Sequence, residues 1–226
     1  MANELSQNLF NQYNSNSKCI LFSEVGVTQP IVEEAFTKKN SKKINLLWAG
    51  NLIPLKNFGL LLESLKLMPI NLDWELKVAG DGRLFNYWNN KANELKFNQK
   101  IEFLGNVPFQ GMHNLYNKAD LFVFPSLREA TGSVILEAMS YSIPVIALEL
   151  NGAKNIIDKN CGILIPVQNK NQMVNDFKDA IIKLSNEPEL RLKMGKNAKE
   201  RIVKHFLWEK RGEEMQKYYN SVCGNG

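Results

Sequence analysis

The sequence contains little cysteine and little histidine, and this scarcity excludes several kinds of site. Its 226 residues include three cysteines, Cys19, Cys161 and Cys223, and two histidines. The cysteines are far apart and form no C-x-x-C pair, so we expect reduced thiols and no zinc site. The histidines, His113 and His205, lie in no pattern typical of a catalytic triad.

Long apolar runs are also missing. None approaches the roughly 18 residues that a membrane-spanning helix needs. The N-terminal sequence MANELSQNLFNQYNSNSK lacks the basic and apolar regions of a signal peptide. Together with the sparse cysteines, these absences predict a cytoplasmic protein.

Three common nucleotide and hydrolase motifs are absent. A nicotinamide dehydrogenase would carry G-x-G-x-x-G after its first strand, where this chain reads AGNLIPLKNFG. The P-loop pattern G-x-x-x-x-G-K-[ST] does not occur, which argues against P-loop kinases and ATPases. No G-x-S-x-G nucleophile elbow is present either, so an α/β-hydrolase is not expected.

Positive charge is concentrated near the C-terminus. Residues 191–217 carry nine Lys or Arg and four Glu, a net charge of +5 that equals the net charge of the whole chain. A solvated basic helix explains this stretch, and so does peripheral contact with an anionic inner membrane surface. No aromatic residues interleave the basic ones in a nucleic-acid motif, so a nucleic-acid partner is not expected.

Short apolar runs alternate with longer amphipathic stretches along the chain. The expected strands are Ile44–Ala49, Trp74–Ala79, Lys100–Leu104, Leu121–Phe124, Pro144–Leu148 and Gly162–Ile165. The expected helices are Phe58–Leu67, Leu84–Leu95, Met112–Lys118, Gly132–Tyr141, Ala153–Asp158, Lys170–Ser185, Glu189–Lys204 and Trp208–Val222. Continuously apolar strands are typical of a parallel sheet buried on both faces. The pattern predicts an α/β fold with a doubly wound, Rossmann-like parallel sheet of about six strands and a helical C-terminal tail.

Ligands of such sheets bind beyond the carboxyl ends of the strands, and the stretch PSLREATGSVILEAM follows one of these ends. Small residues at a helix N-terminus offer unpaired N–H groups and a positive dipole, which together form an anion site. Glu129 precedes this helix and Glu137 lies within it, so both carboxylates can accept hydrogen bonds from hydroxyl groups. A nucleotide sugar has hydroxyls at both ends and phosphate between them. Solvated glutamates favoured by the helix dipole remain an alternative reading.

A glycoside hydrolase is a weaker interpretation of these two carboxylates. Retaining hydrolases hold their carboxylates roughly 5 Å apart, whereas eight residues of helix span about 12 Å. Gly80-Asp81-Gly82 follows another expected strand without a third glycine, which favours a simple turn over a dinucleotide site. Trp48, Trp74, Phe122 and Phe124 are expected in the core.

The chain resembles the C-terminal, donor-binding domain of retaining GT-B glycosyltransferases of family 4 (group 1). The resemblance covers about residues 23–219. Its most specific part is FPSLREATGSVILEAMSYSIPVIALELNGAKNIIDKNCGILIP, with the E-x7-E helix and the P-V-I-A strand. WAGNLIPLKNFGLLLESL, VAGDG, IEFLGNV and LYNKADLFVFPS follow the order and spacing of that family.

The resemblance implies roles for particular residues. Glu129 and Lys56 would be catalytic, with Glu129 holding hydroxyls of the donor sugar and Lys56 neutralising the departing diphosphate. Glu137 would hold the ribose of a UDP- or GDP-sugar. The remaining donor-binding residues would be Gly50, Asn51, Gly80, Asp81, Gly82, Val107, Thr131, Gly132, Ser133 and Val134. Such enzymes use no bound metal and no cofactor.

Two positions depart from the family pattern. Asn51 stands where a second diphosphate-binding arginine is usual, and it carries no charge. Ala130 and Thr131 replace the usual glycine and aromatic residue. The first departure predicts either weaker binding of the donor or a cation supplied from elsewhere, and the second leaves open how closely the sugar is held.

The resemblance also predicts the organisation of the chain. Residues 1–40 would be a trailing segment and linker from a missing N-terminal acceptor domain, residues 41–204 the donor-binding domain, and residues 205–226 a C-terminal helix. The expected activity is that of a hexosyltransferase fragment that is inactive alone, from an enzyme acting on a glycan or lipid-linked acceptor in polysaccharide synthesis. A GT-B-like nucleotide-sugar epimerase and a non-catalytic nucleotide-sugar-binding module remain alternatives.

Overall fold

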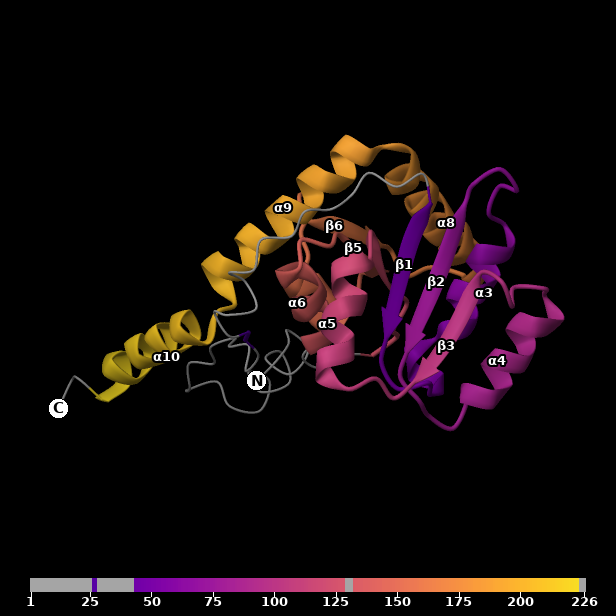
Figure 1. The fold of residues 1–226 in the computed structure, drawn as a ribbon. Helices are drawn as coiled ribbons and strands as arrows, with labels where there is room; N and C mark the ends of the chain where they lie inside the picture. The colour runs from indigo at the N-terminus through magenta and orange to yellow at the C-terminus, as the bar shows by residue number, and fades with distance from the viewer. Residues whose placement is uncertain (1–25, 28–42, 129–131, 224–226) are drawn as a thin grey trace.

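The computed structural model describes residues 26–27, 43–128 and 132–223, and its centre is one parallel sheet (Figure 1). The strands are β1 (Ile44–Ala49), β2 (Trp74–Ala79), β3 (Ile101–Gly105), β4 (Leu121–Phe124), β5 (Val145–Leu148) and β6 (Gly162–Ile165). Their order across the sheet is β3-β2-β1-β4-β5-β6, and every pairing is parallel. This is the doubly wound Rossmann order, so the predicted fold class is confirmed.

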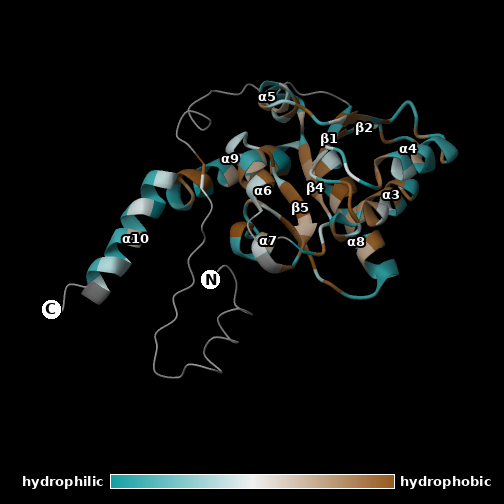
Figure 2. Cartoon of the chain, turned by 90° about the horizontal axis from the view of Figure 1, so that it is seen from below, coloured by the Kyte–Doolittle hydropathy of each residue, from teal (hydrophilic) through white to brown (hydrophobic). Residues whose placement is uncertain are grey.

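Helices cover both faces of the sheet (Figure 1). They are α3 (Phe58–Lys66), α4 (Phe85–Glu94), α5 (Phe109–Lys118), α6 (Ser133–Ser140), α7 (Asn151–Ile156), α8 (Lys170–Asn186), α9 (Pro188–His205) and α10 (Trp208–Cys223), with a 3-10 turn, η1, at Pro54–Lys56. Helices α3 and α8 pack on one face, and α5, α6 and α9 pack on the other. Figure 2 shows hydrophobic residues gathered in the strands and in the helix faces that meet them.

Alternate residues of β1, β4 and β5 enter opposite cores, because successive side chains of a strand point to opposite faces. In β1, Leu46 and Trp48 belong to the core beneath α3 and α8, whereas Leu47 and Ala49 belong to the core beneath α5 and α6. Burying each large side chain contributes about 1.5–3 kcal/mol. The expectation that the strands are buried on both faces is therefore confirmed for β1, β4 and β5. It is wrong for β2 and β3, where Glu75, Lys77 and Glu102 form a polar, solvent-accessible face.

The predicted core aromatics are buried, with exposed fractions of 0% for Trp48 and Phe122, 1% for Phe124 and 2% for Trp74. The predicted trailing segment and linker, residues 1–40, lie outside the described residues, apart from Gly26 and Val27. Val27 forms an isolated parallel bridge with Leu207, between α9 and α10.

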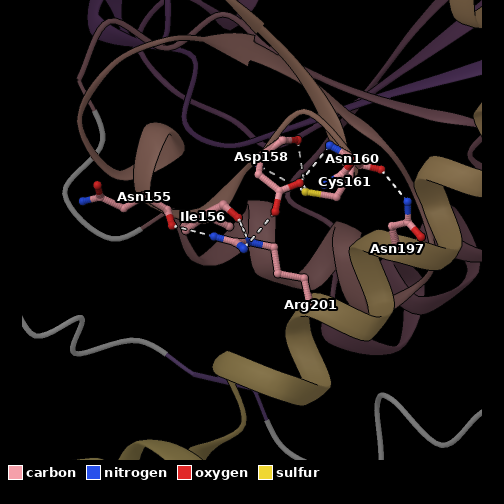
Figure 3. Close-up of polar contacts among 7 residues, drawn as sticks. All are labelled: Asn155, Ile156, Asp158, Asn160, Cys161, Asn197 and Arg201. Carbon is pink, nitrogen blue, oxygen red and sulfur yellow. Dashed lines mark hydrogen bonds and ion pairs between the residues drawn. The ribbon is translucent and has the colours of Figure 1, made fainter.

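A group of polar contacts fastens α9 to the loop between α7 and β6 (Figure 3). Arg201 donates to the carbonyls of Ile156 at 2.6 Å and Asn155 at 3.3 Å, and to Asp158 Oδ2 at 2.9 Å. In the same loop, the Asp158 N–H donates to Cys161 Sγ at 3.2 Å. Burial raises the pKa of the Cys161 thiol to about 11, so this free cysteine stays protonated and structural.

No helix within the described parts of the chain is long and apolar enough to cross a membrane. Helix α10 extends away from the sheet domain and is largely hydrophilic (Figures 1 and 2).

Candidate functional site

The loops that follow β1 and β4 meet at the carboxyl edge of the sheet. These strands are neighbours, and the strand order reverses between them, which is where ligands bind in open α/β sheets. The backbone carbonyl of Leu55 accepts hydrogen bonds from the Leu127 N–H at 2.9 Å and from Ser126 Oγ at 3.4 Å. Segments about 70 residues apart in sequence therefore form one surface.

Lys56 is held on this surface by local backbone structure. It ends the 3-10 turn that begins at Pro54, and Asn57 then takes a left-handed conformation with φ of 49° before α3 begins. The ammonium nitrogen of the half-buried Lys56 lies 5.2 Å from the ring centroid of Phe124, the last residue of β4. A cation is therefore placed between the ends of β1 and β4.

Glycines allow the loops after β1 and β2 to pack backbone against backbone. Gly80 has φ of +132°, and a Cβ there would lie 1.9 Å from the carbonyl oxygen of Gly50. At Gly82 a Cβ would lie 2.8 Å from the backbone nitrogen of Leu52. Leu52 N–H donates to the carbonyl of Asp81 at 2.7 Å, which joins the two loops. No other residue type fits this approach.

The end of β3 adds a third loop to the edge. Gly80 N–H donates to the carbonyl of Gly105 at 2.7 Å, and Val107 lies half-buried beyond it. Asp81 and Asn51 are exposed. Asp81 Oδ1 accepts a hydrogen bond from the Gly82 N–H at 2.7 Å, so the Asp81 carboxylate stabilises its own turn.

Helix α6 begins at this edge with a glycine in a strained position. Gly132 is the N-cap, is buried, and has a left-handed φ of 62°. Ser133 is exposed and Val134 half-buried. The first N–H groups of a helix have no acceptor within the helix, so this end of α6 can bind an anion.

Glu137 lies one turn into α6 and contacts α5. Tyr116 Oη donates to Glu137 Oε2 at 2.9 Å. Burial raises the pKa of the Glu137 carboxyl, and the hydrogen bond from Tyr116 partly opposes that rise. Burial and the neighbouring Glu137 raise the pKa of Tyr116 well above its usual value, so its hydroxyl remains a donor.

Sequence reasoning did not identify Tyr116 or the aromatic side chains beside it. The ring of Tyr116 stacks on Tyr141 with centroids 5.0 Å apart, and Tyr141 Oη lies 2.8 Å from His113 Nδ1. Tyr116 stands in the quoted stretch LYNKADLFVFPS, but the direction in which a helical side chain faces depends on how α5 packs. A polar aromatic residue in an otherwise apolar helix face was the one available signal.

The structure thus brings most of the predicted site residues to one edge of the sheet. These are Gly50, Asn51, Lys56, Gly80, Asp81, Gly82, Val107, Gly132, Ser133, Val134 and Glu137. Glu129 and Thr131, like Ala130, lie outside the described residues. Within the parts that the structure describes, no group of three or more His, Cys, Asp or Glu residues could hold a metal ion.

Sequence comparison relates the chain to known glycosyltransferases. It is 31% identical to an uncharacterised glycosyltransferase of Methanocaldococcus jannaschii, covering 98% of this chain and 57% of that protein. It is 30% identical to the Escherichia coli UDP-Gal:alpha-D-GlcNAc-diphosphoundecaprenol alpha-1,3-galactosyltransferase, covering 83% of this chain and 48% of that enzyme. The chain spans about half the length of these curated relatives.

Solved structures share the fold at lower identity. A Staphylococcus aureus TarM variant in complex with UDP superposes with a TM-score of 0.80 at 20% identity, covering 96% of this chain and 43% of TarM. Anabaena Alr3699/HepE in complex with UDP and glucose superposes with a TM-score of 0.77 at 18% identity, and the match covers 97% of this chain and 62% of that protein. The sheet and its helices therefore have the architecture of GT-B glycosyltransferases. The profile of the family Glycosyl transferases group 1 matches residues 32–201, and the chain belongs to that family.

Proposed function

We propose that the chain is the donor-binding half of a retaining, metal-independent glycosyltransferase of family 4. It binds a UDP- or GDP-sugar, and the intact enzyme transfers the sugar to a glycan or lipid-linked acceptor. The observation that carries this proposal is the meeting of the β1 and β4 loops, which gathers Lys56, the start of α6 and Glu137 at one edge. Membership of the group 1 family supports the same function.

The arrangement suggests how the donor would lie. The ribose diol would bind the Glu137 carboxylate, and the diphosphate would lie at the α6 N-terminus around Gly132 and Ser133, with Lys56 beside it. The Gly80-Asp81-Gly82 turn and the segment after β3 that carries Val107 would line the pocket for the base. UDP in two of the structural relatives favours uridine, whereas a GDP-mannose-dependent mannosyltransferase of Corynebacterium glutamicum, 26% identical, leaves guanosine as the alternative.

In the transfer step the bond between the anomeric carbon and the diphosphate oxygen breaks, and a bond to the acceptor oxygen forms on the same face of the sugar. The acceptor hydroxyl gives its proton to the leaving diphosphate. Negative charge develops on the leaving diphosphate. Lys56 and the N–H groups at the start of α6 stabilise that charge, so both act more strongly in the transition state than in the ground state. Glu129 would hold sugar hydroxyls, as the family resemblance implies. The acceptor and its binding groups would belong to a domain preceding this one, so transfer requires the longer protein.

Nucleotide binding tests the proposal directly. UDP, GDP, ADP and their common sugar conjugates are titrated by calorimetry and thermal shift into the wild type, Glu137→Ala and Lys56→Ala, with the exposed Lys193→Ala as control. One nucleotide should stabilise the wild type and Lys193→Ala, by about 2.7 kcal/mol at 100 times its Kd. Both site variants should lose that stabilisation. Absence of nucleotide binding at millimolar concentration, in this chain and in a longer protein containing it, would falsify the proposal.

A turnover assay separates the two alternative functions. Incubation of the longer protein with donor alone yields an epimerised nucleotide sugar only if the protein is an epimerase. The exposed, uncharged Asn51 is the observation that favours a binding module without catalysis. Donor binding without transfer to any glycan or lipid-linked acceptor would support that reading.

A further inference from the structure

The hydroxyl of Tyr116 fixes one of the two carboxylate oxygens of Glu137. Tyr116 is 2% exposed and lies in the middle of α5, whereas Glu137 is half-buried on α6. The 2.9 Å hydrogen bond to Oε2 is therefore a contact between two helices rather than within one. It occupies one acceptor oxygen of the carboxylate and restricts the side chain to one orientation.

The ring of Tyr116 is itself held in place from several sides. It stacks on Tyr141 at a centroid distance of 5.0 Å and an interplanar angle of 28°, and its centroid lies 6.4 Å from that of Phe122. Tyr141 Oη is 2.8 Å from His113 Nδ1. Because the ring cannot turn away, packing fixes the position of the Tyr116 hydroxyl oxygen.

The other carboxylate oxygen has a different environment. Among the residues that the structure describes, none donates a hydrogen bond to Glu137 Oε1. An ionised carboxylate has about four lone-pair sites, so Oε1 and the second lone pair of Oε2 can accept further hydrogen bonds. A pair of adjacent ligand hydroxyls matches this acceptor geometry.

We propose that Tyr116 is the positioning residue that makes the donor site selective for ribonucleotides. It holds the Glu137 carboxylate so that both hydroxyls of a ribose can donate to it, and a 2′-deoxyribose, with one of those hydroxyls missing, leaves an acceptor unpaired. The inference rests on the proposed function, because Glu137 must face the nucleotide. It goes further in assigning the sugar selectivity of that site to a residue that touches no ligand.

The same hydrogen bond also affects the pKa of Glu137. Burial raises its pKa and the Tyr116 hydroxyl lowers it, so removing the hydroxyl leaves burial unopposed and the pKa rises further. In the described residues, the titratable groups around this carboxylate are Tyr116 from α5 and, behind it, Tyr141 at the end of α6 and His113 on α5. A protonated carboxyl accepts hydroxyl hydrogen bonds poorly, so loss of the Tyr116 hydroxyl should weaken ribose binding first at low pH.

Two measurements on wild type and Tyr116→Phe test the inference. The first titrates the Glu carboxyl carbons by NMR in ligand-free protein, with the Glu137 signal assigned through Glu137→Gln. The second measures calorimetric affinities between pH 5 and 8 for the nucleoside diphosphate that binds best and for its 2′-deoxy analogue. Tyr218→Phe is the matched control, because it removes a hydrogen bond to Glu214, on the distant helix α10.

In Tyr116→Phe we expect a higher pKa for Glu137 and an affinity for the ribonucleotide that is about tenfold lower. The preference over the 2′-deoxy analogue should shrink, and affinity should fall at a higher pH than in wild type as the solution is acidified. Tyr218→Phe should behave as wild type in every measurement. Circular dichroism checks that each variant is folded.

Three results would overturn the inference, and they differ in what they say about the proposed function. If the pKa of Glu137 is the same in Tyr116→Phe as in wild type, the Tyr116 hydroxyl does not act on Glu137. The inference then fails, whatever the nucleotide titrations show. Loss of binding in Glu137→Gln with unchanged selectivity in Tyr116→Phe contradicts the inference but leaves the proposed function intact. No binding of any nucleotide by wild type and by a longer protein containing it, together with a shifted Glu137 pKa, contradicts the proposed function and with it the role of Tyr116.

Discussion

Glu137 combines a cost to stability with the role in binding that we propose for it. A half-buried carboxylate has lost part of its hydration, and a single hydrogen bond from Tyr116 replaces only some of it. Apolar residues surround the helix turn that carries it, since Ile135, Leu136 and Ala138 are all buried. A ligand that donates hydroxyl hydrogen bonds would supply what the protein leaves unsatisfied.

Replacing Glu137 by Gln should therefore stabilise the ligand-free protein at neutral pH. Burial places the folded-state pKa of this group above its unfolded value, so the folded state binds more protons between the two values. Stability of wild type is then lost as the pH rises from about 4 through the folded pKa. Urea unfolding at several pH values should show the advantage of Glu137→Gln growing over that range.

The exposed pair Lys91–Glu94 provides the control for this experiment. Glu94→Gln should change stability by less than about 0.5 kcal/mol at every pH, because surface ion pairs contribute little. A difference between Glu137→Gln and wild type that does not vary with pH would contradict a raised pKa for Glu137.

At the scale of elements, sequence periodicity predicted most boundaries to within one residue, and local chemistry explains two of the differences. Four of the six strands have the predicted bounds. Strand β5 begins at Val145 rather than Pro144, and proline has no N–H for a ladder hydrogen bond. Helix α5 begins three residues before the predicted Met112, because Gly111 interrupts the apolar pattern; a Cβ at Gly111 would lie 2.7 Å from a Val107 methyl.

The candidate site was predictable in part for similar reasons. Strand ends and glycine turns mark where ligands bind in such a sheet, and the family resemblance added roles for Lys56, Gly80 and Glu137 at these positions. Tyr116, the hydrogen-bond partner of Glu137, could not be predicted from the sequence. Its hydroxyl reaches Glu137 only because of how α5 is rotated against α6. That rotation is decided by packing between residues far apart in sequence.

Arg201 fastens α9 to the α7–β6 loop, and its loss should be measurable (Figure 3). Arg201→Met keeps the apolar stem but removes three hydrogen bonds, two of them to backbone carbonyls. Because the side chain is 26% exposed, water replaces part of what is lost, and we expect a cost of about 2 kcal/mol in urea unfolding.

Lys196→Met on the same helix is the matched control. Lys196 is 79% exposed and lies 3.9 Å from Glu200, so its replacement should cost less than about 0.5 kcal/mol. Equal stability of the two variants would show that the contacts of Arg201 do not hold the loop.

At the scale of the whole molecule, α9 and α10 differ in how much they contribute to the fold. Helix α9 places Ala198 and Ile202 in the core beneath α6, and Phe206 follows at its end. Helix α10 has no buried side chain among those described, and its contacts include Arg211 over the Phe206 ring at 4.8 Å. The sheet domain therefore depends on α9 far more than on α10.

Two truncations test this difference. A chain ending at Leu207 should still unfold cooperatively. Its free energy of unfolding should be lower by about 1–2 kcal/mol, which is the expected contribution of one cation–π contact and some packing. A chain ending at Glu187 should not fold, since removing several buried side chains at about 1.5–3 kcal/mol each exceeds the stability of a typical domain. Circular dichroism and urea unfolding give both results, and a folded protein ending at Glu187 would refute the role of α9.

The bridge between Val27 and Leu207 has a mechanical consequence. Val27 N–H donates to the Phe206 carbonyl at 2.8 Å, and Trp208 N–H donates to the Val27 carbonyl at 3.2 Å. The two segments run parallel, so a pulling force applied before Gly26 and after Trp208 loads both hydrogen bonds in shear. Tension between these points passes through the bridge first, and the sheet that carries the glycine loops stays unloaded until the bridge gives way.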